Sequence, residues 1–181
     1  MSGTENAVPP PIPGPSIPAA SIREEGPAAP QRPVVGVGVV VLRDEHVLLI
    51  RRGKPPRTGQ WSIPGGKQEL GETWRAAAHR EVMEETGLEI EVLGLIDVVD
   101  AIVRDGDDMT PDRRRVSDPD RPILYHYTLV DAAAVWKAGE PVAGSDAAHA
   151  EWIPLGELDA YPLWDETVRI IHGAVAMRDG T

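Results

Sequence analysis

The segment 80–87 reads Arg-Glu-Val-Met-Glu-Glu-Thr-Gly, and it limits what this chain can fold into more than any other part. An α-helix turns about 100° per residue, so Glu81, Glu84 and Glu85 fall within an arc of roughly 100° on one side of a helix. A tryptophan and two alanines lie on or beside the same arc one to two turns earlier, so this face is partly buried. Three carboxylates crowded on such a face repel one another and lose hydration. The fold must therefore place positive charge among them.

Arg80 alone cannot neutralise three carboxylates, and a hard divalent cation such as Mg²⁺ or Mn²⁺ is the simplest answer. An isolated E-x-x-E-E run is more often a solvated helix face supported by neighbouring cations. The flanking residues decide against that interpretation here. Gly66 and Glu72 precede the run at fixed distances, and a glycine and Leu88 close it.

The full pattern from Gly66 to Leu88 is G-x5-E-x7-R-E-V-x-E-E-x-G-L, and it resembles the signature of the Nudix hydrolases at every fixed position. The preceding residues, 59–66, read G-Q-W-S-I-P-G-G and look like the usual lead-in of that family. With flanking strands, the resemblance covers residues 34 to about 172. It implies an α/β fold, a Nudix-type three-layer α/β/α sandwich with a mixed β-sheet.

Composition divides the chain into three regions. Residues 1–33 hold nine of the 18 prolines and few large apolar side chains, so this Pro-rich tail is predicted to be disordered. Residues 34–176 are predicted to form the Nudix hydrolase domain, and residues 177–181 a C-terminal tail. The chain has no cysteine, and its net charge of −11 argues against a nucleic-acid polymer as partner. No segment resembles a secretory signal or a membrane span, so we expect a cytoplasmic protein.

Hydrophobic patterning predicts the elements of this domain. A β-branched run starts the first strand, and its G-V-G segment lacks the third glycine and the helix of a dinucleotide motif, so its glycines are expected to permit close backbone approach. A helix is predicted from about Thr73 to Glu85, with Gly87 at its C-terminal cap. A second helix is predicted over 163–176, with Leu163, Val168, Ile171 and Val175 toward the core. Strands are predicted over 34–42, 46–52, 122–130 and 151–153, and one or two strands over 88–103.

The resemblance assigns roles to the residues of the signature. Glu81, Glu84 and Glu85 correspond to the metal-binding glutamates, joined by the carbonyl of Gly65, and two or more ions of Mg²⁺ or Mn²⁺ are implied. Arg80 is expected to orient the neighbouring glutamates through charge-assisted hydrogen bonds. The structural positions of the motif are Gly66, Glu72 and Gly87, and Glu72 is expected to hold the loop to the helix.

The general base remains open at this point. Glu81 is the first candidate, with Asp146 and Glu151 as alternatives on a later segment. Lys67 is expected to pair either with a substrate phosphate or with a helix glutamate. Substrate phosphates are also expected to meet one of the neighbouring pair Arg51 and Arg52, because adjacent strand residues point to opposite faces. Lys54 and Arg57 are further candidates in the basic loop. Core packing is the first interpretation of Trp61, Tyr125 and Tyr127, and stacking on a base is the second.

The signature indicates hydrolysis of a phosphoanhydride bond in a nucleoside diphosphate linked to a group X, and it does not define X. ADP-ribose or a nucleotide sugar is the first expectation, and a MutT-type pyrophosphohydrolase of (d)NTPs is the alternative. A non-catalytic nucleotide sensor is a remote alternative, because all the glutamates are intact and the chain has no helix-turn-helix. Many members of the family form homodimers, and the resemblance extends that option to this chain. The roles of the Pro-rich tail and of the charged loop 104–121 are not defined by the sequence.

Overall fold

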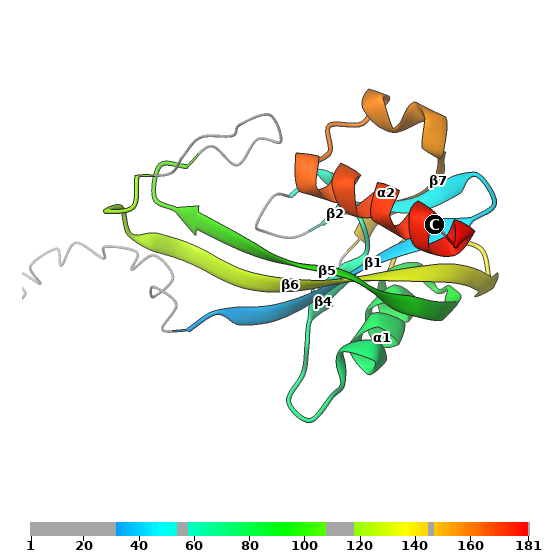
Figure 1. Ribbon diagram of the computed structural model, residues 1–181, viewed down its shortest axis with the longest axis horizontal. Helices are drawn as coiled ribbons and strands as arrows, with labels where there is room; N and C mark the ends of the chain where they lie inside the picture. The colour runs from blue at the N-terminus through cyan, green and yellow to red at the C-terminus, as the bar shows by residue number, and fades with distance from the viewer. Residues whose placement is uncertain (1–31, 54–57, 108–117, 145–146, 181) are drawn as a thin grey trace, which may run out of the picture.

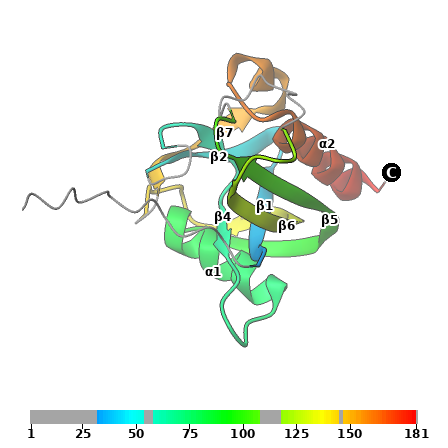
Figure 2. The same ribbon diagram turned by 90° about the vertical axis from the view of Figure 1, so that its left-hand side faces the viewer.

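The computed structural model describes residues 32–53, 58–107, 118–144 and 147–180. One sheet of seven strands runs through the molecule, with a helix on each of its faces (Figures 1 and 2). The elements in chain order are β1 (Val34–Arg43), β2 (His46–Arg52), β3 (Trp61–Ser62), β4 (Gly65–Lys67), α1 (Trp74–Thr86), β5 (Glu89–Arg104), β6 (Ile123–Ala138), β7 (Ala147–Pro154), the 3-10 helix η1 (Leu155–Ala160) and α2 (Asp165–Asp179). This α/β arrangement confirms the predicted three-layer sandwich.

The sheet is mixed because β1 pairs in parallel with β6, whereas its pairs with β2 and β4 are antiparallel. The strand order is β3-β2-β1-β6-β5, with β4 added beside β1 and β7 beside β2. β4 accompanies β1 at Gly36–Gly38, and β2 accompanies it only at Leu42 and Arg43. The neighbour of β1 on this side therefore changes along its length, from β4 to β2. The segment that joins β3 to β4 lies between them, where the N–H of Val39 donates to the carbonyl of Pro64 at 2.9 Å.

Apolar side chains cover both faces of the sheet, as its β-branched strands require. On one face, Val40, Leu49 and Ile153 pack with Ile171 of α2. On the other face, Val39, Leu48 and Ala134 pack with alanines and a valine of α1. The two helices lie on opposite sides of the sheet in both views (Figures 1 and 2).

Helix α1 begins and ends where its capping residues predict. The hydroxyl of Thr73 accepts a hydrogen bond from the backbone N–H of Ala76 at 3.2 Å. Gly87 has φ 71°, a left-handed conformation that glycine adopts without a side-chain penalty, and its N–H donates to the carbonyl of Met83 at 2.9 Å. These caps position the glutamates of the last turn next to β4.

Several predicted boundaries were wrong. β6 runs eight residues beyond the predicted end at 130 because an alanine-rich run continues its pairing with β5. β7 starts at Ala147, before the predicted short strand. α2 begins at Asp165, so Leu163 is buried ahead of the helix, and α2 continues to Asp179, into the predicted C-terminal tail. The Pro-rich tail lies outside the described residues except for its last two positions. No helix of the described ranges is long and apolar enough to cross a membrane.

Candidate functional site

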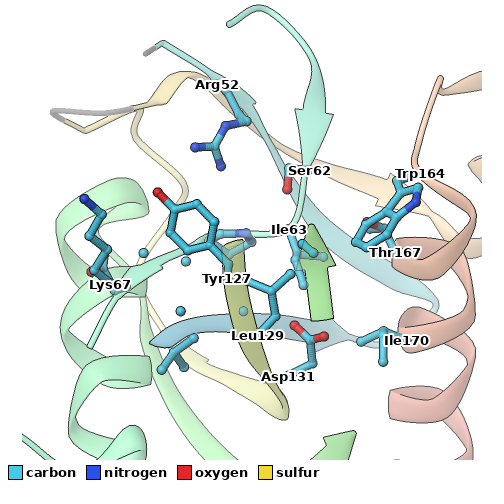
Figure 3. A pocket seen from close by; sticks show the side chains of 18 of the residues that line it. Arg52, Ser62, Ile63, Lys67, Tyr127, Leu129, Asp131, Trp164, Thr167 and Ile170 are labelled. Carbon is cyan, nitrogen blue, oxygen red and sulfur yellow. The ribbon is translucent and has the colours of Figure 1, made fainter. Parts of the chain in front are cut away.

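A cavity of about 730 Å³ opens beside the paired strands β1 and β4, and its lining extends from α1 to α2. Glu81 and Glu85 of α1, together with Arg80, line one part of it. The strand face of Tyr127, Leu129 and Asp131 lines another part, and the first turns of α2 supply Trp164, Thr167 and Ile170. In Figure 3, Lys67 and Arg52 lie to one side of this cavity, and Asp131 and Ile170 lie to the other.

Arg80 is the centre of the polar network at the α1 side. Its guanidinium donates to both carboxylate oxygens of Glu72 at 3.0 Å, and to the carbonyl of Lys67 at 3.0 Å. It also donates to Glu81 at 2.8 Å and to Glu84 at 3.3 Å. These bonds raise the pKa of Arg80 and lower the pKa of Glu72, chiefly through the hydrogen bond between the two side chains. Glu72 also accepts from the N–H of Glu69, and it thereby links the loop to the helix.

Glu81 and Glu85 lie against the glycine pair of β4. Glu85 is 6% exposed and accepts a hydrogen bond from the N–H of Gly65 at 2.9 Å. A Cβ atom on Gly66 would lie 2.4–2.5 Å from the carboxylate of Glu81, so only glycine leaves room for that carboxylate. Burial raises the pKa of Glu81, against the lowering effect of Arg80. The glycines therefore bring backbone and two carboxylates together at the cavity wall.

The donors at this wall are carboxylate and carbonyl oxygens, the ligands that Mg²⁺ and Mn²⁺ prefer. As the side chains stand, the described part of the chain gathers no three His, Asp or Glu side chains around one point. Arg80 explains this arrangement, because its guanidinium holds Glu81 and Glu84 by charge-assisted bonds. The donor chemistry of this wall, and the cavity onto which it opens, fit a hard divalent cation.

The structure separates the two arginines at the end of β2, as their strand positions predict. Arg52 lines the cavity, whereas Arg51 does not line it and donates to the carbonyl of Gly59 at 2.9 Å. Lys67 lines the cavity with an exposed side chain. Glu84 is outside the lining, and 55% of its side chain is exposed. Lys54 and Arg57 lie outside the described residues.

Of the two alternative general bases, Glu151 lies within the described residues, and it is placed away from the cavity. Glu151 is outside the lining, and its carboxylate lies 3.2 Å from the Nε2 atom of His149. Asp146 lies outside the described residues. Of the two predicted bases that the structure describes, Glu81 is the one at the cavity.

The three aromatic residues discussed from the sequence all line the cavity. Trp61 also packs edge-on against Tyr161 and His149, with ring centroids 5.2 and 5.8 Å apart, so its cavity-lining and packing roles coexist. Sequence reasoning missed the α2 wall and Asp131. The available signal was an aspartate that interrupts the apolar run L-V-D-A-A-A-V of residues 129–135.

Known proteins are similar to this chain in sequence and in fold. Residues 32–172 match the NUDIX domain family. The chain is 35% identical over 126 residues to an ADP-ribose pyrophosphatase of Methanocaldococcus jannaschii, a match covering 70% of this chain and 64% of that protein. It is 44% identical over 69 residues to a MutT-like protein of Streptomyces ambofaciens, covering 38% of this chain and 43% of the other. The crystal structure of a MutT NUDIX hydrolase from Burkholderia pseudomallei superimposes with a TM-score of 0.62 and 28% identity, over 79% of this chain and 98% of that one.

Proposed function

The chain belongs to the NUDIX family of hydrolases, and from this premise we propose that it cleaves a phosphoanhydride bond of a nucleoside diphosphate linked to a second group X. One observation carries the proposal. Glu81 and Glu85 meet the Gly65–Gly66 backbone at the wall of the cavity, so oxygen donors converge where a substrate has access. The cavity volume is within the range of roughly 300–1,000 Å³ that small-molecule sites occupy.

The proposed cation ligands are the carboxylates of Glu81, Glu84 and Glu85 and the carbonyl of Gly65. Bound Mg²⁺ or Mn²⁺ would lower the pKa of a coordinated water and neutralise charge on the phosphoryl oxygens. Arg80 is the proposed positioning residue, because it holds two of these carboxylates and the loop glutamate Glu72 at once.

Glu81 is the proposed general base, because it lines the cavity and Glu151 does not. Arg52 and Lys67 line the same cavity and are the proposed phosphate contacts, since each presents positive charge to it. Arg51 is left out of the proposed site because its side chain is turned to the carbonyl of Gly59. The wall formed by Tyr127, Leu129 and α2 then remains for the nucleoside.

ADP-ribose or a nucleotide sugar is the proposed first substrate class, supported by the archaeal relative named ADP-ribose pyrophosphatase, whose match extends over 70% of this chain. Cleavage of (d)NTPs is the second candidate. It is supported by the higher identity, 44%, to the MutT-like protein, although that match covers 38% of the chain.

Formation of nucleotide products, separated by chromatography, from a panel of ADP-ribose, nucleotide sugars, dinucleoside polyphosphates and nucleoside triphosphates tests the proposal, with Mg²⁺ and with Mn²⁺. We expect turnover of one class, lost in Glu85→Gln and retained in the control Glu89→Gln at the exposed start of β5. Absence of turnover with nucleotide still bound would refute the enzyme proposal in favour of a sensor. Equal turnover in both variants would refute the assignment of the metal site.

A further inference from the structure

Asp131 is a buried carboxylate at the α2 side of the cavity. It lies in the middle of β6, directly across from Gly38 of β1 and Asp97 of β5, and only 5% of its surface is exposed. The three residues that follow it are fully buried alanines of the core. Asp131 lines the cavity, and Figure 3 shows its carboxylate directed into it between Leu129 and Ile170.

The Asp131 carboxylate has no hydrogen-bond or ion-pair partner among the residues that the structure describes. The charged groups that act on it are Asp97 of β5 and Glu166 and Arg169 of α2. Arg169 is engaged elsewhere, at 2.8 Å from Asp97 and 2.6 Å from Glu166. Burial raises the pKa of Asp131 to about 6. The Asp131 oxygens are not sealed off from the cavity, so donors of a bound ligand can reach them, and such donors would offset the cost of a carboxylate that is otherwise buried and unpaired.

The backbone opposite is shaped around this carboxylate. A Cβ atom on Gly38 would lie 2.2 Å from Oδ1 of Asp131 and 3.0 Å from Cδ1 of Ile63, so any larger residue would fill the space. Trp164 and Ile170 lie on the far side of the same end of the cavity (Figure 3). A carboxylate flanked by aliphatic side chains, with an aromatic ring in the same cavity wall, suits a flat heterocycle that carries N–H donors on its edge.

We propose that Asp131 selects the nucleobase of the substrate, its two oxygens accepting the paired N–H donors of a guanine edge. This inference rests on the proposed function, because phosphates held near α1, Arg52 and Lys67 leave the base to reach the opposite end of the cavity. Guanine presents a ring N–H beside an amino group, two donors for an ionised carboxylate that can only accept. Adenine presents an amino group beside a ring nitrogen that accepts, so one oxygen of Asp131 would face a lone pair. Within the proposed substrate classes, the inference therefore favours guanosine-linked nucleotide sugars and triphosphates over ADP-ribose and other adenosine-linked members.

Substrate pairs that differ only in the base test this inference: a GDP-sugar with the ADP-sugar of the same sugar, and GTP with ATP. At pH 8 we expect the guanosine member of each pair to have the higher kcat/KM. Asp131→Asn should lower the ratio of kcat/KM for the guanosine member to that for the adenosine member by about tenfold or more. The control Asp100→Asn removes an exposed carboxylate of β5 that is not among the charged groups acting on Asp131, and it should leave the ratio unchanged. An unchanged ratio in Asp131→Asn, or a wild-type preference for adenosine, would overturn the inference.

The pH dependence of the same ratio is an independent measurement on the wild-type protein. As pH falls from 8 to 5, protonation of Asp131 replaces one acceptor by a donor, and the guanosine preference should decrease around pH 6. Titration of the α1 glutamates affects both members of a pair and cancels in the ratio. A ratio that is constant from pH 8 to 5 would count against Asp131.

Calorimetric binding of GMP and AMP separates this inference from the proposed function, because neither ligand has a phosphoanhydride bond. Tighter binding of GMP that is lost in Asp131→Asn would support the base assignment even if no substrate of the panel were hydrolysed. Equal binding of the two ligands by the wild-type protein would overturn the assignment, even if the protein proved to be an active hydrolase.

Discussion

Gly65→Ala is expected to inactivate the site by displacing β4 from β1. Gly65 has φ 151°, and a Cβ atom there would lie 2.2 Å from the carbonyl oxygen of Val37 and 3.0 Å from Cα of Gly38. Ordinary contact begins at 3.4 Å, so the overlap with the Val37 oxygen is about 1.2 Å, and both contacting groups belong to the backbone of a central strand. β4 must therefore move by about an ångström, because β1 is fixed by its pairing with β6.

That displacement affects function directly, since the N–H of Gly65 binds Glu85 and the carbonyl of Gly65 is a proposed cation ligand. A misplacement of about 1 Å at a reacting centre costs about 10²-fold in rate, so we expect kcat/KM to fall by about that factor. Overpacking and backbone strain together should lower the free energy of unfolding by about 2–5 kcal/mol. Hydrolysis assays and urea denaturation of the purified variant measure the two effects.

Gly71→Ala is the matched control. Gly71 also has a positive φ, 86°, but no atom lies within 4 Å of its Cβ position. It should lose only about 1 kcal/mol of stability to backbone strain and keep its activity. Activity of Gly65→Ala within fivefold of wild type, or an equal loss of activity in both variants, would refute the reasoning.

Three further predictions address charge and cations. Asp131→Asn should stabilise the fold by up to about 3 kcal/mol above pH 6 and by almost nothing near pH 4. The reason is that the pKa of Asp131 is about 6 in the native state and 3.8 unfolded, so the native state is penalised once the carboxyl is ionised, and asparagine removes that penalty. Urea denaturation at several pH values measures this, and the absence of a gain at pH 8 would contradict it. Arg80→Lys should lower kcat/KM by about tenfold, because a lysine cannot hold both oxygens of Glu72 and also Glu81, whereas Arg75→Lys on the same helix should be close to wild type; steady-state kinetics decide between them. Removal of divalent cations with EDTA should abolish turnover and leave the far-UV circular dichroism spectrum unchanged, because the two apolar clusters stabilise the fold. A loss of secondary structure in EDTA would contradict this prediction.

The sequence predicted the signature helix and the first two strands well because their signals are local. Thr73 and Gly87 terminate α1 through bonds within one turn, and the β-branched run of β1 requires a buried strand in any arrangement. The glycines of the first strand were expected to permit close backbone approach; β4 does come close to Gly38, since a Cβ atom on Gly65 would lie 3.0 Å from its Cα, and Gly38 also leaves room for the side chain of Asp131. The family resemblance supplied the fold class, which depends on long-range pairing that no local pattern contains.

The second half of the cavity could not be predicted in the same way. The position of Asp131 in the cavity wall depends on its register against β1 and on the position of α2. Both are set by contacts between residues distant in sequence. The full length of β6 could not be predicted because its alanines have low strand propensity. They are held in the strand by pairing with β5, which is distant in the sequence. The start of the last helix was predicted at residue 163, two residues before α2 begins. The hydrophobic pattern of this segment did not indicate that Trp164 and Ile170 line the cavity.

The parallel pairing of β1 with β6 has a consequence for the order of folding. Its partners, from Val34 with Tyr127 to Leu42 with Val135, are about 90 residues apart in the chain, so a long loop must close before the central pair of strands forms. The cavity needs that pair, and it also needs the first turns of α2. A nascent chain on the ribosome that has exposed only the signature helix therefore has all the glutamates and no place for a substrate, and nucleotide binding should begin only after residue 170 has emerged.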